Sequence, residues 1–328
     1  MQRTSKAFVI VAVVFAGLSA SCSKPAHSGE RYVFIATNIN IPYWQDAKAG
    51  FLDSARALDG AKVEFVGPSR YAPDEELKDF RDTMASKPDG ILISPSQPDS
   101  FKEAIDSAVA AGVPVICVDS DAPGSHRVLF IGTDNYLAGE QSGNTMAGLL
   151  HGRGGVVVIK IAGQNNQEER ARGVRDAVKK YPALAVAIEV NDSGDANQAG
   201  ESVAAMIRNG GHPDGIICLE ASCGPGVAQA LDQLGMANKI PIVAMDANPE
   251  TLDRIAQGYI VASIAQKPYT MGYYGLQYLD DLHHNRIHEF PDWRTAPVSP
   301  LPSIVDTGTA VVNAGNVQTY LSAVARPK

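Results

Sequence analysis

The chain has 328 residues, of which 45% are hydrophobic and 20% are charged, a composition typical of a globular protein with two ordinary domains. Its formal net charge of −8 argues against a nucleic-acid partner, because a surface that binds nucleic acid needs a basic patch. No basic run or helix-turn-helix pattern precedes the globular part, which argues against a DNA-binding repressor.

Residues 1–22 have the pattern of a secretory signal peptide. Arg3 and Lys6 precede an apolar run at 7–18 that is too short to span a membrane comfortably, and small residues lead to Cys22. This pattern predicts a lipoprotein signal with a lipidated Cys22, although Leu18 stands four residues before the cysteine rather than three. The alternative is ordinary cleavage without a lipid. We expect residues 23–30 to be a tether, and the exported protein to be periplasmic or at the cell surface, held at the membrane only through the lipid.

From Arg31 onward, short apolar runs rich in β-branched residues alternate with amphipathic helical patterns. Strands are expected at 32–39, 61–67, 90–94, 113–119, 128–132, 155–161, 183–190, 215–219, 240–245 and 259–265. Helices are expected at 43–58, 74–86, 100–111, 137–150, 168–180, 197–208, 227–234, 249–257 and 271–284. This alternation predicts parallel sheets covered on both faces, arranged as two doubly wound α/β lobes.

The two halves of the chain repeat one order of features. The run DGILIS at 89–94 matches DGIICL at 214–219, and each is followed by a helix and then by a strand led by proline. Those strands read PVICVDSDAP and PIVAMDANPE, and they end at Asp119 and Asp246. Parallel strands share composition by chance, but the shared order of features favours a duplicated lobe.

Ligands of open parallel sheets bind beyond the carboxyl ends of the strands, where Asp119 and Asp246 stand. If the two lobes face each other across a cleft, both carboxylates reach one ligand, and a carboxylate is well suited to accept hydrogen bonds from neighbouring hydroxyls. The alternative for a single aspartate is a helix cap or a turn. The matching positions favour ligand contact.

Other polar and aromatic residues also follow the expected strands. Tyr43 and Trp44 open a helix and offer flat faces to a sugar ring, with burial in the core as the alternative. Arginine offers a planar fork of donors, which Arg170 and Arg172 supply. The remaining candidates are hydroxyl, carboxylate and amide side chains, namely Ser94, Ser96, Thr133, Glu220 and Gln266. This set is typical of a site for a sugar or a cyclitol.

At these residues the chain resembles the ribose/galactose-type periplasmic sugar-binding proteins, which are type I substrate-binding proteins of ABC importers. The resemblance runs from about 31 to 321 and is carried by NIPYWQ, DGILISP, PVICVDSDAP, IGTDNYLAGEQSG, QEERARGV, IVAMDANP and SIAQKPYTMG. It implies ligand contacts at Thr37, Asn38, Asn40, Ile41, Tyr43, Trp44, Asp119, Arg170, Asp246 and Gln266, with lesser contacts at Ser94 and Thr133.

The chain departs from the ribose binders at four places. It has Ile41 and Glu220 where they have asparagine, Ser120 where they have arginine, and no third aromatic near Ala196. These departures argue against ribose and favour a different or larger polyol, such as a hexose, a pentose pyranose or an inositol. Asp121 and Asp195 are candidates to compensate for the losses.

The resemblance also implies three segments that cross between the lobes, expected near 132–134, 265–267 and 297–303. The first lobe is then 31–133 plus 267–297, and the second is 134–266 plus 298–328. A ligand that bridges the lobes stabilises the closed form, which docks on a membrane permease. We expect a monomer.

An enzyme is the alternative class. The chain has no G-x-G-x-x-G after the first strand, no Walker loop, no G-x-S-x-G and no H-E-x-x-H, so we expect no catalytic residue and no cofactor. A pair of cleft carboxylates can in principle hydrolyse glycosides. A third reading is a periplasmic sensor that presents sugar to a chemoreceptor or a kinase, which the sequence does not distinguish.

The histidines and cysteines leave two further questions. His283, His284 and His288 cluster near a helix end, where a solvated terminus is favoured over a metal site, so no metal is expected. Cys117 and Cys218 lie in apolar runs and are interpreted as small core residues. A disulfide between Cys218 and Cys223 is left open.

Overall fold

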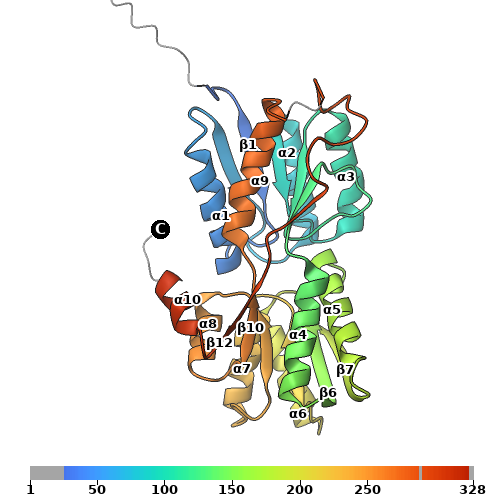
Figure 1. The fold of residues 1–328 in the computed structure, drawn as a ribbon, viewed down its shortest axis with the longest axis vertical. Helices are drawn as coiled ribbons and strands as arrows, with labels where there is room; N and C mark the ends of the chain where they lie inside the picture. The colour runs from blue at the N-terminus through green and yellow to red at the C-terminus, as the bar shows by residue number, and fades with distance from the viewer. Residues whose placement is uncertain (1–25, 288–289, 325–328) are drawn as a thin grey trace, which may run out of the picture.

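The computed structural model describes residues 26–287 and 290–324, which form two α/β lobes stacked end to end (Figure 1). The predictions for the signal peptide, Cys22 and His288 lie outside these residues. None of the described helices is long and apolar enough to cross a bilayer.

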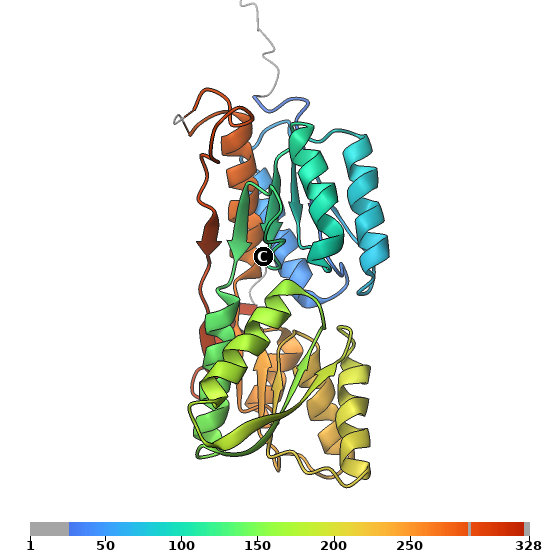
Figure 2. The same ribbon diagram turned by 90° about the vertical axis from the view of Figure 1, so that its right-hand side faces the viewer.

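The first lobe is a fully parallel six-stranded sheet with the order β11-β5-β4-β3-β1-β2. Its strands are β1 (Arg31–Ile35), β2 (Lys62–Val66), β3 (Gly90–Ile93), β4 (Val115–Val118), β5 (Leu129–Gly132) and β11 (Ile304–Asp306). Its helices are α1 (Pro42–Ala55), α2 (Pro73–Ala85), α3 (Pro98–Ala110) and α9 (Pro268–His283). Alternate residues of β1 face opposite sides, so Phe34 packs with α1 and α9 while Ile35 packs with α2 and α3. Figure 2 shows α9 on one side of this sheet and α2 and α3 on the other.

The second lobe repeats this plan with the strand order β12-β10-β9-β8-β6-β7, in which only β12 is antiparallel to its neighbour. Its strands are β6 (Arg153–Lys160), β7 (Ala183–Asn191), β8 (Gly215–Cys218), β9 (Ile242–Met245), β10 (Ala262–Ala265) and β12 (Ala310–Asn313). Its helices are α4 (Asn135–Leu149), α5 (Asn165–Val178), α6 (Ala196–Arg208), α7 (Cys223–Gln233), α8 (Pro249–Ala256) and α10 (Val317–Val324). The two sheets confirm the predicted pair of doubly wound lobes.

The third segment that crosses between the lobes lies later than the sequence predicted. Ile304 pairs with Phe130 in the first sheet, so the chain stays in the first lobe up to Asp306 and crosses between β11 and β12. The assignment of all of 298–328 to the second lobe is therefore corrected. The reason is that β11 is only three residues long and partly exposed, so it has no apolar run to mark it. The helix α10 and the strand β12 were also not predicted.

The expected tether 23–30 is in part packed against the first lobe. Residues 26–29 form a turn directly before β1, and the side chains of His27 and Glu30 are buried. The end of the predicted tether nearest the lobe is therefore part of the folded body.

Candidate functional site

The carboxyl ends of both sheets meet between the lobes and enclose a small polar cavity. Its volume is about 50 Å³. The residues that line it come from both lobes and are Thr37, Ile41, Tyr43, Trp44, Asp119, Ile161, Gln164, Asn166, Gln167, Arg170, Glu220, Ala221, Asp246 and Gln266. We call this space the interlobe cavity.

Asp119, at the end of β4, connects groups from both lobes. Its carboxylate accepts hydrogen bonds from the Tyr43 hydroxyl at 2.6 Å and the Ser94 hydroxyl at 3.4 Å, both in the first lobe. The Asn166 amide of the second lobe donates to it at 2.8 Å. Burial raises the pKa of Asp119, and the positive charge of Arg170, whose Nη2 lies 3.8 Å from Oδ1, opposes this effect.

Arg170 is 1% exposed and is held by three hydrogen bonds of 2.8 Å, to Asn135 Oδ1, Leu219 O and Gln266 Oε1. Gln266 in turn donates through Nε2 to Asp246 Oδ1 at 2.9 Å. The guanidinium thus has a fixed orientation between the two aspartates. Burial raises the pKa of Asp246 to about 7, against the lowering effect of the Arg170 charge.

Several acceptors in the interlobe cavity have no hydrogen-bond partner among the described residues. They are Gln164 Oε1, Asn166 Oδ1, Gln167 Oε1 and Glu220 Oε1, and each of these atoms is buried. Buried polar atoms in native proteins are almost always satisfied by protein, water or ligand. These acceptors are therefore well placed for the hydroxyl groups of a polyol.

Tyr43 and Trp44 line the cavity and belong to the core at the same time. Their exposed fractions are 5% and 2%, and their rings meet edge to face with centroids 5.1 Å apart. Trp44 also meets Phe34 edge to face at 6.1 Å. The interpretation of these aromatics as core residues is therefore confirmed, and their role as a platform for a ligand stays a prediction.

The structure brings most of the predicted site residues together. Tyr43, Trp44, Asp119, Arg170, Glu220, Asp246 and Gln266 line the cavity, and Ser94 contacts it through Asp119. Thr133 is buried where the chain crosses between the lobes, and its hydroxyl has no partner among the described residues.

Four residues that the sequence suggested as ligand contacts do not line the interlobe cavity. Asn40 is exposed and donates to Ser69 O, while the Asn38 side chain accepts from the Asn40 backbone. Asp121 forms a two-point ion pair with Arg127 outside the cavity. Asp195 caps α6.

The start of α5 contributes residues that the sequence analysis did not single out. Gln164, Asn166 and Gln167 line the cavity, together with Ile161 at the end of β6. The polar run QNN at 164–166, two residues after an expected strand, was the available signal. Arg172, which was considered beside Arg170, points outward and pairs with Glu169.

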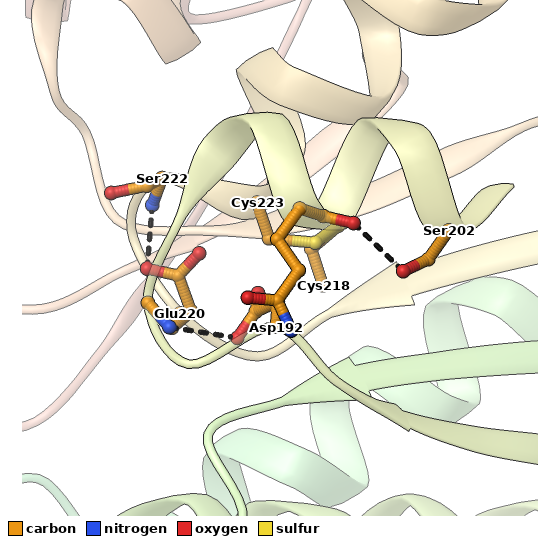
Figure 3. The surroundings of a disulfide bond; sticks show 8 residues. Asp192, Ser202, Cys218, Glu220, Ser222 and Cys223 are labelled. Carbon is orange, nitrogen blue, oxygen red and sulfur yellow. Dashed lines mark hydrogen bonds between the residues drawn. A yellow bond between two sulfur atoms is a disulfide. The ribbon is translucent and has the colours of Figure 1, made fainter. Parts of the chain in front are cut away.

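A disulfide joins Cys218 and Cys223 and closes the loop between β8 and α7 that carries Glu220 (Figure 3). This settles the pairing that the sequence left open, and Cys117 is a buried free thiol. Glu220 accepts from the Ser222 backbone at 2.8 Å, and its carboxyl group lies close to that of Asp192. Burial and the neighbouring Asp192 charge hold the pKa of Glu220 well above its usual range.

A larger groove of about 580 Å³ lies beside the cavity, between α1 and the helices α8 and α10. It shares Tyr43, Asp246 and Gln266 with the cavity. The buried carboxylates and unpartnered acceptors converge on the smaller space, so the interlobe cavity is the better candidate for recognition and the groove extends it.

The sequence and the fold are similar to those of known proteins. A family model described as a periplasmic binding protein domain matches residues 32–285. The D-allose-binding periplasmic protein of Escherichia coli K12 is 25% identical over 274 residues, which cover 81% of this chain and 88% of that protein.

Solved structures agree over nearly the whole described chain. AraP, an arabinose-binding protein from Geobacillus stearothermophilus, is 35% identical with a TM-score of 0.72, covering 89% of this chain and 99% of that one. A solute-binding protein of Burkholderia graminis in complex with D-arabinose is 28% identical with a TM-score of 0.80, covering 90% and 98%.

Proposed function

The chain belongs to the periplasmic binding protein family, and from this premise we propose that it captures a monosaccharide between its lobes and delivers it to an ABC importer. The observation that carries the proposal is the convergence of Asp119 from the first lobe with Asn166 and Arg170 from the second. Only closure of the lobes brings these donors and acceptors to one point, so a ligand that bonds to both sets stabilises the closed form.

We propose a pyranose sugar as the ligand. Carboxylates, an arginine fork and amide oxygens suit a ring of hydroxyls, and the Trp44 face suits its C–H groups. A cavity of about 50 Å³ is smaller than ordinary ligand pockets, which measure about 300–1,000 Å³, so the lobes must part to admit the sugar before they close around it. The relatives named for D-allose and arabinose define the first compounds to test.

A thermal-shift screen followed by calorimetry tests the proposal. The panel is D-arabinose, D-ribose, D-allose, D-tagatose and myo-inositol, and we expect at least one to bind 1:1 and raise Tm, because a ligand of the folded state stabilises it by mass action. Small-angle scattering is expected to show compaction at saturation. The sugar should be recovered unchanged, since no catalytic function is proposed. Binding of none of these compounds, or binding with turnover, would overturn the proposal.

We further propose that Cys22 anchors the exported monomer at the membrane through a lipid. The support is the residue pattern at 1–22, and the anchor would keep the binding lobes near the permease. Intact-mass measurement of the mature protein from the membrane fraction tests this. We expect an acylated Cys22 in the wild type and release of the Cys22→Ser variant into the soluble fraction. An unmodified mature N-terminus would refute the anchor without affecting the sugar proposal.

A further inference from the structure

Two histidines and two carboxylates meet at the end of the first lobe farthest from the interlobe cavity. His27 and Glu30 stand just before the amino end of β1, and Asp280 and His284 lie one turn apart at the end of α9. Figure 1 shows α9 ending at the same end of the lobe at which the described chain begins. One ligand atom from each of the four side chains lies within 4.8 Å of the others.

The distances among these atoms match the edges of a small coordination polyhedron. His27 Nδ1 lies 2.9 Å from Glu30 Oε2, 3.3 Å from Asp280 Oδ1 and 3.2 Å from His284 Nε2. His284 Nε2 lies 3.0 Å from Glu30 Oε1 and 3.4 Å from Asp280 Oδ1. Ligands at the 2.0–2.1 Å bond lengths of zinc stand about 3.3 Å apart in a tetrahedron.

Protons alone do not account for this convergence. His284 Nε2 carries at most one hydrogen, yet two carboxylate oxygens and a second imidazole nitrogen lie within 3.4 Å of it. His27 Nδ1 has three such neighbours as well. Two hydrogens cannot form hydrogen bonds across all five of these short N···O and N···N contacts, whereas a single cation at the centre contacts all four side chains.

Asp280 supplies an independent sign of a ligand. Its side chain is fully buried, and Oδ1, the atom that faces both histidines, has no hydrogen-bond partner among the described residues. The other carboxylate oxygen of Asp280, Oδ2, pairs with Arg286. The second carboxylate of the group, Glu30, accepts a hydrogen bond at Oε2 from the Tyr32 hydroxyl at 3.2 Å. These outer contacts orient the carboxylates in the way that second-shell groups orient metal ligands.

We propose that His27, Glu30, Asp280 and His284 form a structural Zn²⁺ site. Two neutral imidazoles and two carboxylates are a donor set that zinc accepts, and their charge balances that of the ion. All four positions are taken by the protein, as in a structural site rather than a catalytic one. The ion would fasten the turn at 26–30 to α9 and so fix the point at which the predicted tether leaves the lobe.

The other group of potential ligands, Asp192, Glu220 and Cys223, does not support a second site. Cys223 is in a disulfide, so its sulfur is not available as a thiolate.

Calorimetric titration of the metal-stripped full chain with ZnCl₂ tests the site. We expect one Zn²⁺ per chain with a Kd of about 1 µM or lower, and a rise in Tm of several degrees. Mg²⁺ and Ca²⁺ should not compete, because they prefer more oxygen ligands. Affinity should fall at least tenfold in His27→Gln and in His284→Gln. The exposed His212→Gln is the control and should bind zinc like the wild type.

Sugar binding by each variant verifies that it is folded, because the interlobe cavity lies at the other end of the lobe. X-ray absorption at the zinc edge should give four nitrogen or oxygen ligands at 2.0–2.1 Å, two of them imidazole. Absence of stoichiometric zinc, or zinc binding that survives in both His27→Gln and His284→Gln, would refute the site. So would binding lost in His283→Gln but kept in His27→Gln, which would place the metal on the helix end alone.

Discussion

Asp119 and Asp246 occupy equivalent places in the two lobes, down to their backbone conformation. Both residues are left-handed, with φ of 64° and 71°, at the ends of β4 and β9. Each donates its backbone N–H to the next strand, to Ile131 O at 3.1 Å and to Ile264 O at 2.9 Å. Aspartate and asparagine tolerate this conformation better than other residues with a Cβ, so the position itself restricts what the chain can place there.

Asp119→Asn is therefore the sharpest test of the carboxylate. Asparagine keeps the volume and the left-handed backbone, so the variant should fold with a Tm close to that of the wild type. Loss of the charge weakens the hydrogen bonds to sugar hydroxyls, and we expect affinity to fall by about 10–100-fold in calorimetry.

The matched control is Asp121→Asn, two residues along the chain. Its carboxylate pairs with Arg127 outside the cavity, so stability is expected to fall while affinity changes little. An affinity loss confined to Asp121→Asn would place the sugar elsewhere.

The role of Trp44 in binding is tested better by a substitution that keeps core packing than by alanine. Because its ring packs against Phe34 and Tyr43 in the core, Trp44→Ala is expected to lose about 3–5 kcal/mol of stability as well as affinity. Trp44→Phe keeps most of the packing, so Tm should drop by only a few degrees while sugar affinity falls, because the ring face is smaller.

Fluorescence distinguishes the role of Trp44 in core packing from its role in sugar binding. The chain has two tryptophans, so Trp293→Phe leaves Trp44 as the reporter. We expect its emission to change on sugar addition. Unchanged emission at saturation, together with wild-type affinity in Trp44→Phe, would show that the ring serves the core alone.

The two lobes and the positions of Asp119 and Asp246 could be predicted because short sequence patterns mark the strands and the strand ends. Apolar runs mark buried parallel strands, and DGILIS and DGIICL mark the repeat. The strand β11 could not be predicted, since it has only three residues, two of them exposed, and it joins the sheet through a tertiary pairing with β5. Gln164, Asn166 and Gln167 were missed because the sequence pattern places the start of this helix at 168, and their side chains line a cavity only where the two lobes meet. Asp121 was considered as a compensation for the departures from the ribose binders, but its carboxylate pairs with Arg127 outside the cavity.

The buried carboxyl group of Glu76 is expected to make the stability of the protein depend on pH, whether or not a ligand is bound. Burial raises its pKa to about 8, and its one described hydrogen bond is from the Ser96 N–H at 3.2 Å. A raised pKa means that the folded state prefers the protonated form. The stability that protonated Glu76 gives to the folded state is fully present below the unfolded pKa of about 4.5, and it is lost as pH rises through about 8.

Glu76→Gln mimics the protonated form at all pH values. We expect it to match the wild type at pH 5 and to exceed it in Tm at pH 9, by at least about 2–4 °C for roughly 1 kcal/mol. The exposed neighbour Glu75→Gln is the control and should show no such pH-dependent gain. Equal Tm of Glu76→Gln and wild type across pH 5–9 would contradict the assigned pKa.

The Cys218–Cys223 disulfide should support both the second lobe and the site. It closes a short loop, and the loop-entropy relation gives a stabilisation of about 2 kcal/mol for that length. Reduction is then expected to lower Tm by about 4–8 °C for a lobe of this size. Sugar affinity should fall as well, because the loop carries Glu220 into the interlobe cavity.

Two cysteine variants distinguish the disulfide from simple packing. The double variant Cys218→Ala/Cys223→Ala should have a lower Tm that dithiothreitol does not change further. Cys117→Ala removes only a buried thiol, so it should keep the full response to dithiothreitol. If mass spectrometry shows complete reduction of the wild type while its Tm and sugar affinity stay constant, the loop holds Glu220 without the bond, and the packing of Cys218 and Cys223 in the second core is what orders it.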